Sequence, residues 1–333
     1  MNVLICMQMV EPGTRIFEKY VLEECIGSGA FGEVWSAHSI STGEMVAVKM
    51  EKIKDNPVPT LNYESRVLQG LQGTIGIPRL RYFGRRDEMD RIFMVFDLLG
   101  ISLETLANSR RFDVNYSTMK NPDPHHAEFI TRIGRQMLQR LRSLHMRGMI
   151  HRDVKPDNFL FARTPILDLS KRASRMNQDP QSIPCLHLID FGMAKRIKSF
   201  GEEKETPRAS TSLIGSARYA SIASHERKPL GRKDDLISMM YSLIYLANGG
   251  ALPWMSYTDD EIYYIKNNMA PSELCNELSQ FHKERWTRIS NCFTAQKQMI
   301  FQITMTLNAT YRDMRQIHEM NNKDYVSLLY IYH

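Results

Sequence analysis

Residues 151–158 place a carboxylate, an ammonium group and a side-chain amide within one short stretch of the chain. Asp153 can accept a proton from a hydroxyl group, and Lys155 can neutralise a phosphoryl group on which negative charge develops. Asn158 can act as a ligand of Mg²⁺. A further carboxylate, Asp190, follows an apolar run and precedes Phe-Gly, which makes it a second candidate ligand that bridges the β- and γ-phosphates of ATP. These residue types predict transfer of a phosphoryl group to a hydroxyl group.

A glycine-rich stretch near the start of the chain could bind the phosphates. Its candidate contact residues are Gly27, Ser28, Gly29, Ala30, Phe31 and Gly32. Glycines allow backbone amides to approach phosphate oxygens without interference from a Cβ atom. The spacing alone is weak evidence. However, it lies between two predicted strands, which favours a glycine-rich hairpin over a dinucleotide site at the start of a helix.

Lys49 ends the apolar run 46–49 of the next predicted strand, where Ala47 points to the same face. Lysines usually extend their stems over apolar surface and keep the charge in water. Beside a glycine hairpin, however, Lys49 could hold the α- and β-phosphates of ATP. Glu64, on the apolar face of the following predicted helix, is the candidate partner that would orient it; the alternative is a solvated helix residue.

The patterning predicts an α+β fold with a small β-rich lobe and a larger helical lobe. Short segments rich in β-branched and aromatic residues predict strands at 20–26, 33–37, 44–50, 79–83 and 92–96. One helix near 64–71 interrupts them, and helical periodicity follows over 130–144 and 236–246. We therefore predict an N-terminal tail at 1–16, the small lobe at 17–99 and the larger lobe at 100–333. Residues 111–124, 163–184 and 200–212 are expected to be loops.

The composition limits the class of partner. The chain has 333 residues, 43% of them hydrophobic and 24% charged, and a net charge of +6. This balance is typical of a globular protein, and the charge is too evenly spread to predict nucleic-acid binding. No run approaches the roughly 18 apolar residues of a membrane span. The five cysteines lack a Cys-x-x-Cys pair, which favours a reducing compartment. We expect a monomer in the cytoplasm, the nucleus or both.

The motifs, taken in this order, resemble those of protein kinases, and the lysine of the 151–158 loop is typical of Ser/Thr kinases; dual specificity stays open. Further segments are similar to the casein kinase I family: 73–84, 97–104, 215–222 where most kinases carry Ala-Pro-Glu, 232–236 and 252–254. The similarity covers roughly 17–255. It implies a bilobal protein kinase fold with an antiparallel sheet and one regulatory helix. It also implies use of ATP and Mg²⁺ and protein substrates phosphorylated at acidic or already phosphorylated sites.

The resemblance also implies roles for single residues. Those expected around the adenine ring are Ile26, Val34, Ala47 and Phe96, with backbone groups of Asp97 and Leu99 contacting the base. Asp235 would hold the 151–158 loop by buried hydrogen bonds. Arg218 would bind a phosphate or acid upstream of the target residue.

The sequence departs from that family in two places. Where members often carry basic residues, 255–261 is acidic, so we hypothesise a weaker dependence on substrate phosphorylation. The 163–184 segment is longer than usual, and its basic residues could bind a partner or be solvated. The alternative function is a catalytically weak, pseudokinase-like interaction module. Retention of Lys49, Glu64, Asp153, Asn158 and Asp190 argues against it. The 218–221 segment resembles a platform for protein substrates, which weighs against a small-molecule kinase.

Overall fold

The computed structural model describes residues 10–29, 32–54, 60–109, 124–163, 183–197, 210–247 and 249–269. The predicted phosphate contacts Ala30 and Phe31 lie outside these ranges. So do nearly all of the three predicted loops and the C-terminal stretch from residue 270.

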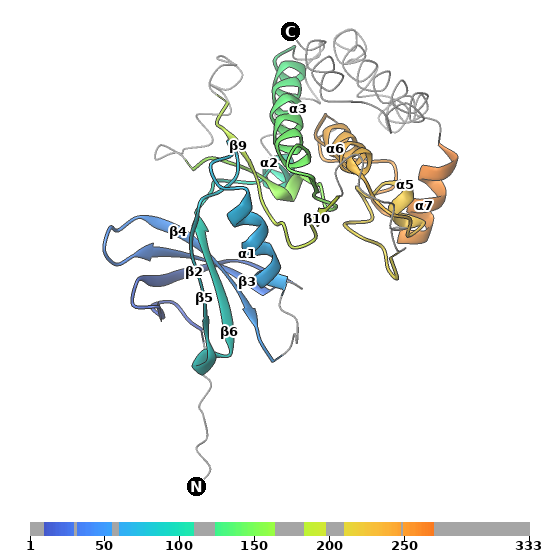
Figure 1. Ribbon diagram of the computed structural model, residues 1–333. Helices are drawn as coiled ribbons and strands as arrows, with labels where there is room; N and C mark the ends of the chain where they lie inside the picture. Colours follow the sequence, from blue (N-terminus) through green and yellow to red (C-terminus); the bar gives the residue numbers. More distant parts are fainter. Residues whose placement is uncertain are drawn as a thin grey trace.

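The small lobe is a six-stranded antiparallel sheet in the order β1-β2-β3-β4-β6-β5 (Figure 1). Its strands are β1 (Arg15–Ile16), β2 (Tyr20–Gly29), β3 (Gly32–Ser39), β4 (Met45–Lys52), β5 (Leu80–Arg86) and β6 (Arg91–Asp97). The sheet begins two residues before the predicted lobe boundary at 17. Trp35, Val48 and Phe93 pack in the core on one side of the sheet, as β-branched and aromatic residues do on a pleated surface. The 3₁₀ helix η1 (Asp87–Met89) connects β5 to β6.

Helix α1 (Thr60–Gly70) packs against β5 and β6 and faces the larger lobe (Figure 1). Leu61 and Leu68, two turns apart on one face, are buried with Met94 of β6 in the same core cluster as the helices of the larger lobe. The core is therefore continuous across the two lobes. This continuity lets α1 deliver a side chain to the junction between them.

The larger lobe is mostly helical. Its elements are α2 (Leu103–Asn108), α3 (Pro124–His145), β7 (Met149–Ile150), η2 (Pro156–Asn158), β8 (Phe159–Phe161), β9 (Leu186–Leu188), β10 (Lys195–Arg196), α5 (Ile222–His225), α6 (Arg232–Ala247) and α7 (Asp259–Asn268). Strand β7 pairs with β10, and β8 pairs with β9, so that the short strands bracket the 151–158 loop and Asp190.

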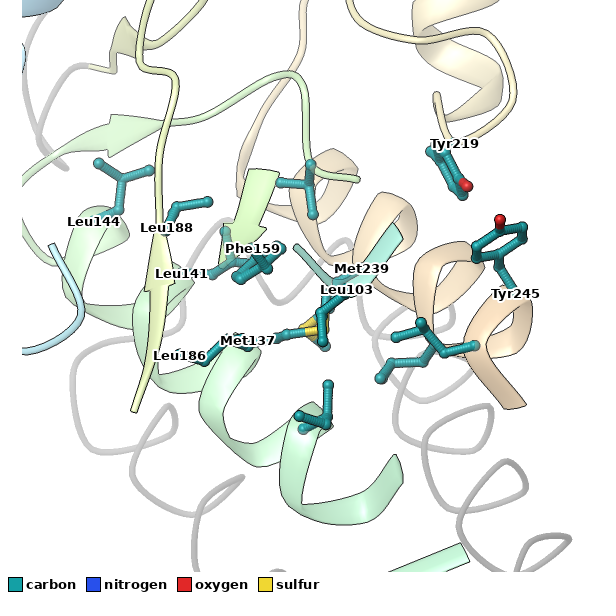
Figure 2. Packing of buried hydrophobic residues seen from close by; sticks show 14 of the residues in the cluster. Leu103, Met137, Leu141, Leu144, Phe159, Leu186, Leu188, Tyr219, Met239 and Tyr245 are labelled. Atoms are coloured by element: carbon teal, nitrogen blue, oxygen red, sulfur yellow. The ribbon is translucent and has the colours of Figure 1, made fainter. Parts of the chain in front are cut away.

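Helices α3 and α6 pack together at the centre of this lobe (Figure 1). The predicted apolar stripe of α3, which includes Met137 and Leu141, is fully buried. Figure 2 shows these side chains beside Phe159 and Leu188, with Met239 of α6 facing them. Residues 236–246 of α6 are apolar on nearly all sides, which suits a helix that is buried in the middle of the lobe. The predicted bilobal α+β fold is confirmed, and none of the described helices is long and apolar enough to cross a membrane.

Candidate active site

Lys49, Glu64 and Asp190 meet where the two lobes join. Lys49 Nζ of β4 lies 2.8 Å from Glu64 Oε2 of α1 and 3.1 Å from Asp190 Oδ1, which follows β9. Glu64 is only 3% exposed. The sequence predicted each of these residues separately, and the fold brings all three together across 141 residues of chain.

The charged groups of this cluster shift one another's pKa values. Burial acts to lower the pKa of Lys49, but the two carboxylates outweigh it and raise the pKa above its ordinary value. Burial acts to raise the pKa of Asp190, yet the attraction and hydrogen bond of Lys49 lower it overall. Burial raises the pKa of Glu64, and Lys49 opposes that shift. Lys49 therefore stays an ammonium ion at neutral pH, as a group that binds phosphate must.

Asp153 is buried at the centre of a second network. Its Oδ1 atom accepts hydrogen bonds from the backbone amide and the hydroxyl of Ser216, at 2.9 and 3.0 Å. Its Oδ2 atom lies 2.8 Å from Lys155 Nζ, which also donates to Ser216 Oγ at 3.1 Å. The carboxylate is therefore fixed in one orientation by a neighbouring cation and by the segment around Ser216.

Asp235 of α6 fixes the backbone of the 151–158 loop. Its two carboxylate oxygens accept from the amides of His151 and Arg152, each at 2.8 Å, and Oδ2 also lies 2.8 Å from His145 Nε2. Burial acts to raise the pKa of Asp235, but the hydrogen bond from His145 and the other contacts lower it. Arg152 has a φ of 70°, a left-handed conformation that these bonds stabilise.

Asn158 and Asp190 offer the oxygen ligands that Mg²⁺ prefers. Asn158 Nδ2 donates to the Asp153 carbonyl at 2.8 Å, which uses the amide nitrogen and leaves the side-chain oxygen for a cation. The amide of Ile189 donates to the Asn158 carbonyl at 3.0 Å and keeps the two segments adjacent. In the described part of the chain, no three His, Cys, Asp or Glu residues group into a metal site. A pair of ligands fits a Mg²⁺ ion that is otherwise held by phosphate oxygens and water.

The glycine-rich stretch forms the hairpin between β2 and β3, as predicted. Gly27 pairs with Val34, Ser28 with Glu33, and Gly29 with Gly32. Gly32 has a φ of 103°, and a Cβ atom there would collide with the Met50 carbonyl of β4. Only glycine allows the hairpin to lie this close to the strand that carries Lys49.

The residues expected around adenine lie on neighbouring strands. Ala47 is buried on β4 and pairs with Phe96 of β6, whereas Ile26 of β2 is half exposed. The backbone amide of Asp97 donates to the Arg79 carbonyl at 3.1 Å. An adenine contact at Asp97 would therefore involve its carbonyl group. Leu99 lies two residues after Asp97, in the connection to the larger lobe.

A family model for the protein kinase domain matches residues 20–325. The chain belongs to the protein kinase family. This kinase fold uses ATP with a divalent metal and has proteins as substrates, and the match spans both lobes described above.

Three contacts of this kinase were not predicted from its sequence. The link from Ser216 to Asp153 depends on the tertiary fold. Tyr63 Oη of α1 donates to the Ala194 carbonyl at 2.9 Å, just beyond Asp190. Lys266 is buried under the 215–221 segment, and the only sequence signal is its position one turn after Ile262 on α7.

Proposed function

We propose that this protein kinase is a Ser/Thr kinase of casein kinase I type that transfers the γ-phosphoryl group of Mg-ATP to protein hydroxyls. The observation that carries the proposal is the fixed, buried carboxylate of Asp153, held by Ser216 and Lys155 beside the Lys49–Asp190 pair. When bound, Mg-ATP supplies the phosphoryl group and the metal neutralises part of its charge.

The residues then have distinct roles. Asp153 orients the substrate hydroxyl and accepts its proton, and Lys155 binds the phosphoryl oxygens. Lys49 holds the α- and β-phosphates and is oriented by Glu64. Asn158 and Asp190 hold Mg²⁺, and the backbone of the β2–β3 hairpin covers the phosphates. The same set of groups argues against a pseudokinase, because such proteins typically lack one of them.

The preference for serine and threonine rests on Lys155 and on the 215–221 segment. Lys155 donates to Ser216, which connects the 151–158 loop directly to that segment. The casein kinase I type rests on the residues of this segment, Gly-Ser-Ala-Arg-Tyr-Ala-Ser, which stand where most kinases carry Ala-Pro-Glu. Trp254 Nε1 donates to the Arg218 carbonyl at 2.8 Å and orients this part of the backbone.

For substrates, we propose acidic sites with a weak dependence on previous phosphorylation. Arg218 is the one proposed anion contact. The acidic residues at 259–261 begin α7, where carboxylates stabilise the N-terminus of a helix, and Glu261 accepts from the Thr258 amide and hydroxyl at 2.8 Å. Stabilisation of the start of α7 accounts for the presence of these acidic residues. Their negative charge nevertheless disfavours the binding of a substrate phosphate nearby.

Two assays test the proposal. The protein is incubated with Mg-ATP and dephosphorylated casein, and the modified residues are located by mass spectrometry. We expect phosphoserine and phosphothreonine; phosphotyrosine alone, or no transfer, contradicts the proposal. A peptide with phosphoserine three residues upstream of the target is then compared with its unphosphorylated twin. Rates within a few-fold of each other are expected, and a much faster primed peptide overturns the weak dependence.

A further inference from the structure

Lys266 is a buried lysine that the proposed roles leave unexplained. It lies in the last turn of α7, a ten-residue helix, and is only 5% exposed. Ile262 lies one turn earlier on the same buried face. Because a lysine on the surface keeps its ammonium in water at almost no cost, a buried one calls for specific partners.

Those partners are backbone carbonyls of the 215–221 segment. Lys266 Nζ donates to the carbonyls of Ala217 and Ala220, at 2.8 and 2.7 Å. It also lies over the rings of Tyr241 and Trp254, at 4.7 and 5.0 Å from their centroids. Aromatic faces attract a cation, so both rings favour the charged form.

Trp254 binds a third carbonyl of the same segment, which lies between those of Ala217 and Ala220. Its Nε1 atom donates to the Arg218 carbonyl, so that two side chains hold three carbonyls within four residues. At the end of the segment, Ser221 Oγ donates to Asp234 of α6 at 2.7 Å. The backbone of the 215–221 segment is thereby fixed from α6, from α7 and from the residues between them.

The other end of the segment contacts the reacting side chains. Ser216 precedes Ala217, and both its amide and its hydroxyl donate to Asp153. Gly215 has a φ of 83°, and a Cβ atom there would lie 2.5 Å from the Arg152 carbonyl. Because Ala217 is bonded directly to Ser216 in the chain, a small shift of Ala217 also moves Ser216 relative to Asp153.

We propose that Lys266 is a positioning residue for protein phosphorylation: it fixes the backbone of Ala217 and Ala220 and, through Ser216, the Asp153 carboxylate. The inference rests on the proposed function in that Asp153 is taken as the proton acceptor. The amine works from below the segment and does not touch the substrate.

The chemistry of an amine suits this role over a range of pH. Burial lowers the pKa of Lys266 to about 7, and Asp259 opposes the shift. His225 of α5, whose Nε2 atom lies 3.2 Å from the Ala217 carbonyl, also has a pKa lowered by burial and by Lys266. An ammonium has three N–H donors and a neutral amine still has two. Both forms can therefore satisfy both carbonyls.

Lys266→Met tests the proposal, because methionine fills nearly the same space but donates no hydrogen bond. Asn267→Ala, at an exposed position next to it on α7, is the matched control. Hydrogen exchange of the 215–221 amides is measured by mass spectrometry in each full-length protein. The kcat/KM for casein and the KM for ATP are then measured for each protein.

We expect exchange in the 215–221 segment of Lys266→Met to be at least tenfold faster, with exchange in β4 unchanged. The kcat/KM for casein should fall at least tenfold while the KM for ATP stays within twofold. Asn267→Ala should match the wild type. Unchanged exchange at 215–221 overturns the proposal, and so does an equal loss in β4 and in ATP affinity, which marks a general loss of structure.

A second variant, Trp254→Phe, keeps an aromatic ring beside the amine but removes the hydrogen bond to the Arg218 carbonyl, together with part of a fully buried ring. It should speed exchange in the same segment by a smaller factor, and no change there contradicts the proposed support even if Lys266→Met fails to fold. If the wild type transfers no phosphate to casein, the proposed function fails. The exchange comparison still decides whether Lys266 holds the segment.

Discussion

Replacing Asp235 by asparagine removes one buried charge where α6 meets the 151–158 loop. The carboxylate accepts three hydrogen bonds, from His145, His151 and Arg152, each at 2.8 Å. An amide keeps one oxygen and turns an NH₂ group toward a donor in place of the other. At least one backbone amide therefore loses its acceptor inside the core.

The magnitude follows from these contacts. A hydrogen bond to a charged group contributes about 1.5 to 3 kcal/mol, and a buried donor left unpaired costs about 1 to 3 kcal/mol more. We expect Asp235→Asn to lower the free energy of unfolding by about 3 to 5 kcal/mol. That is a large part of the 5 to 15 kcal/mol that is typical of a folded domain. The left-handed backbone of Arg152 would lose a hydrogen bond from its amide. Because Asp153 is the next residue, the rate of phosphotransfer should fall as well.

Urea unfolding followed by circular dichroism measures the stability, and transfer to casein measures the activity. Asp87→Asn is the control, because the same chemical change then occurs on a side chain that is 76% exposed. It should shift the free energy of unfolding by less than about 0.5 kcal/mol. A change below about 1 kcal/mol for Asp235→Asn, with full activity, would refute the view that this carboxylate holds the loop.

Three further predictions concern other contacts. Tyr63→Phe removes one hydroxyl that bonds to Ala194, so kcat/KM for ATP should fall a few-fold while stability changes by about 1 kcal/mol or less; unchanged ATP-dependent initial rates would contradict this. Gly215→Ala puts a Cβ atom 2.5 Å from the Arg152 carbonyl at a φ of 83°, so turnover of casein should fall at least tenfold, and retained turnover would show that the segment adapts. The unfolded chain keeps the ordinary pKa of Lys266, so between pH 7 and about 10 it binds a proton that the folded protein has lost. Wild-type stability relative to Lys266→Met should therefore rise by about 1.4 kcal/mol per pH unit in urea titrations, and a pH-independent difference would contradict the lowered pKa.

The sequence was sufficient for the fold because local patterns and the tertiary structure agree. The strand expected at 33–37 is β3 (Gly32–Ser39), and the stripe through Leu141 lies on α3 as periodicity requires. Glu64 could be proposed as the partner of Lys49 because a lysine that holds phosphates needs an anionic group to orient it, and Glu64 lies on the apolar face of the next helix. The expectation for Asp235 came from the family resemblance alone.

The remaining contacts depend on tertiary packing that the sequence does not display. Tyr63 is 42% exposed and would be taken for a surface residue without the approach of the chain at Ala194. Lys266 breaks the apolar pattern of α7, and its partners are carbonyls, which every residue carries and no motif marks. The acidic residues at 259–261 suggest an effect on substrates from the sequence alone, whereas in the fold Glu261 also caps α7.

Phosphate transfer from Mg-ATP to dephosphorylated casein by the wild type and by Asp153→Asn tests the central claim most directly. The substitution keeps the size of the side chain and removes the proton acceptor. We expect kcat to fall by about 10²-fold or more, as is typical for a positioned general base, while ATP affinity is unchanged. Transfer by the variant within threefold of the wild-type rate would contradict the role of Asp153.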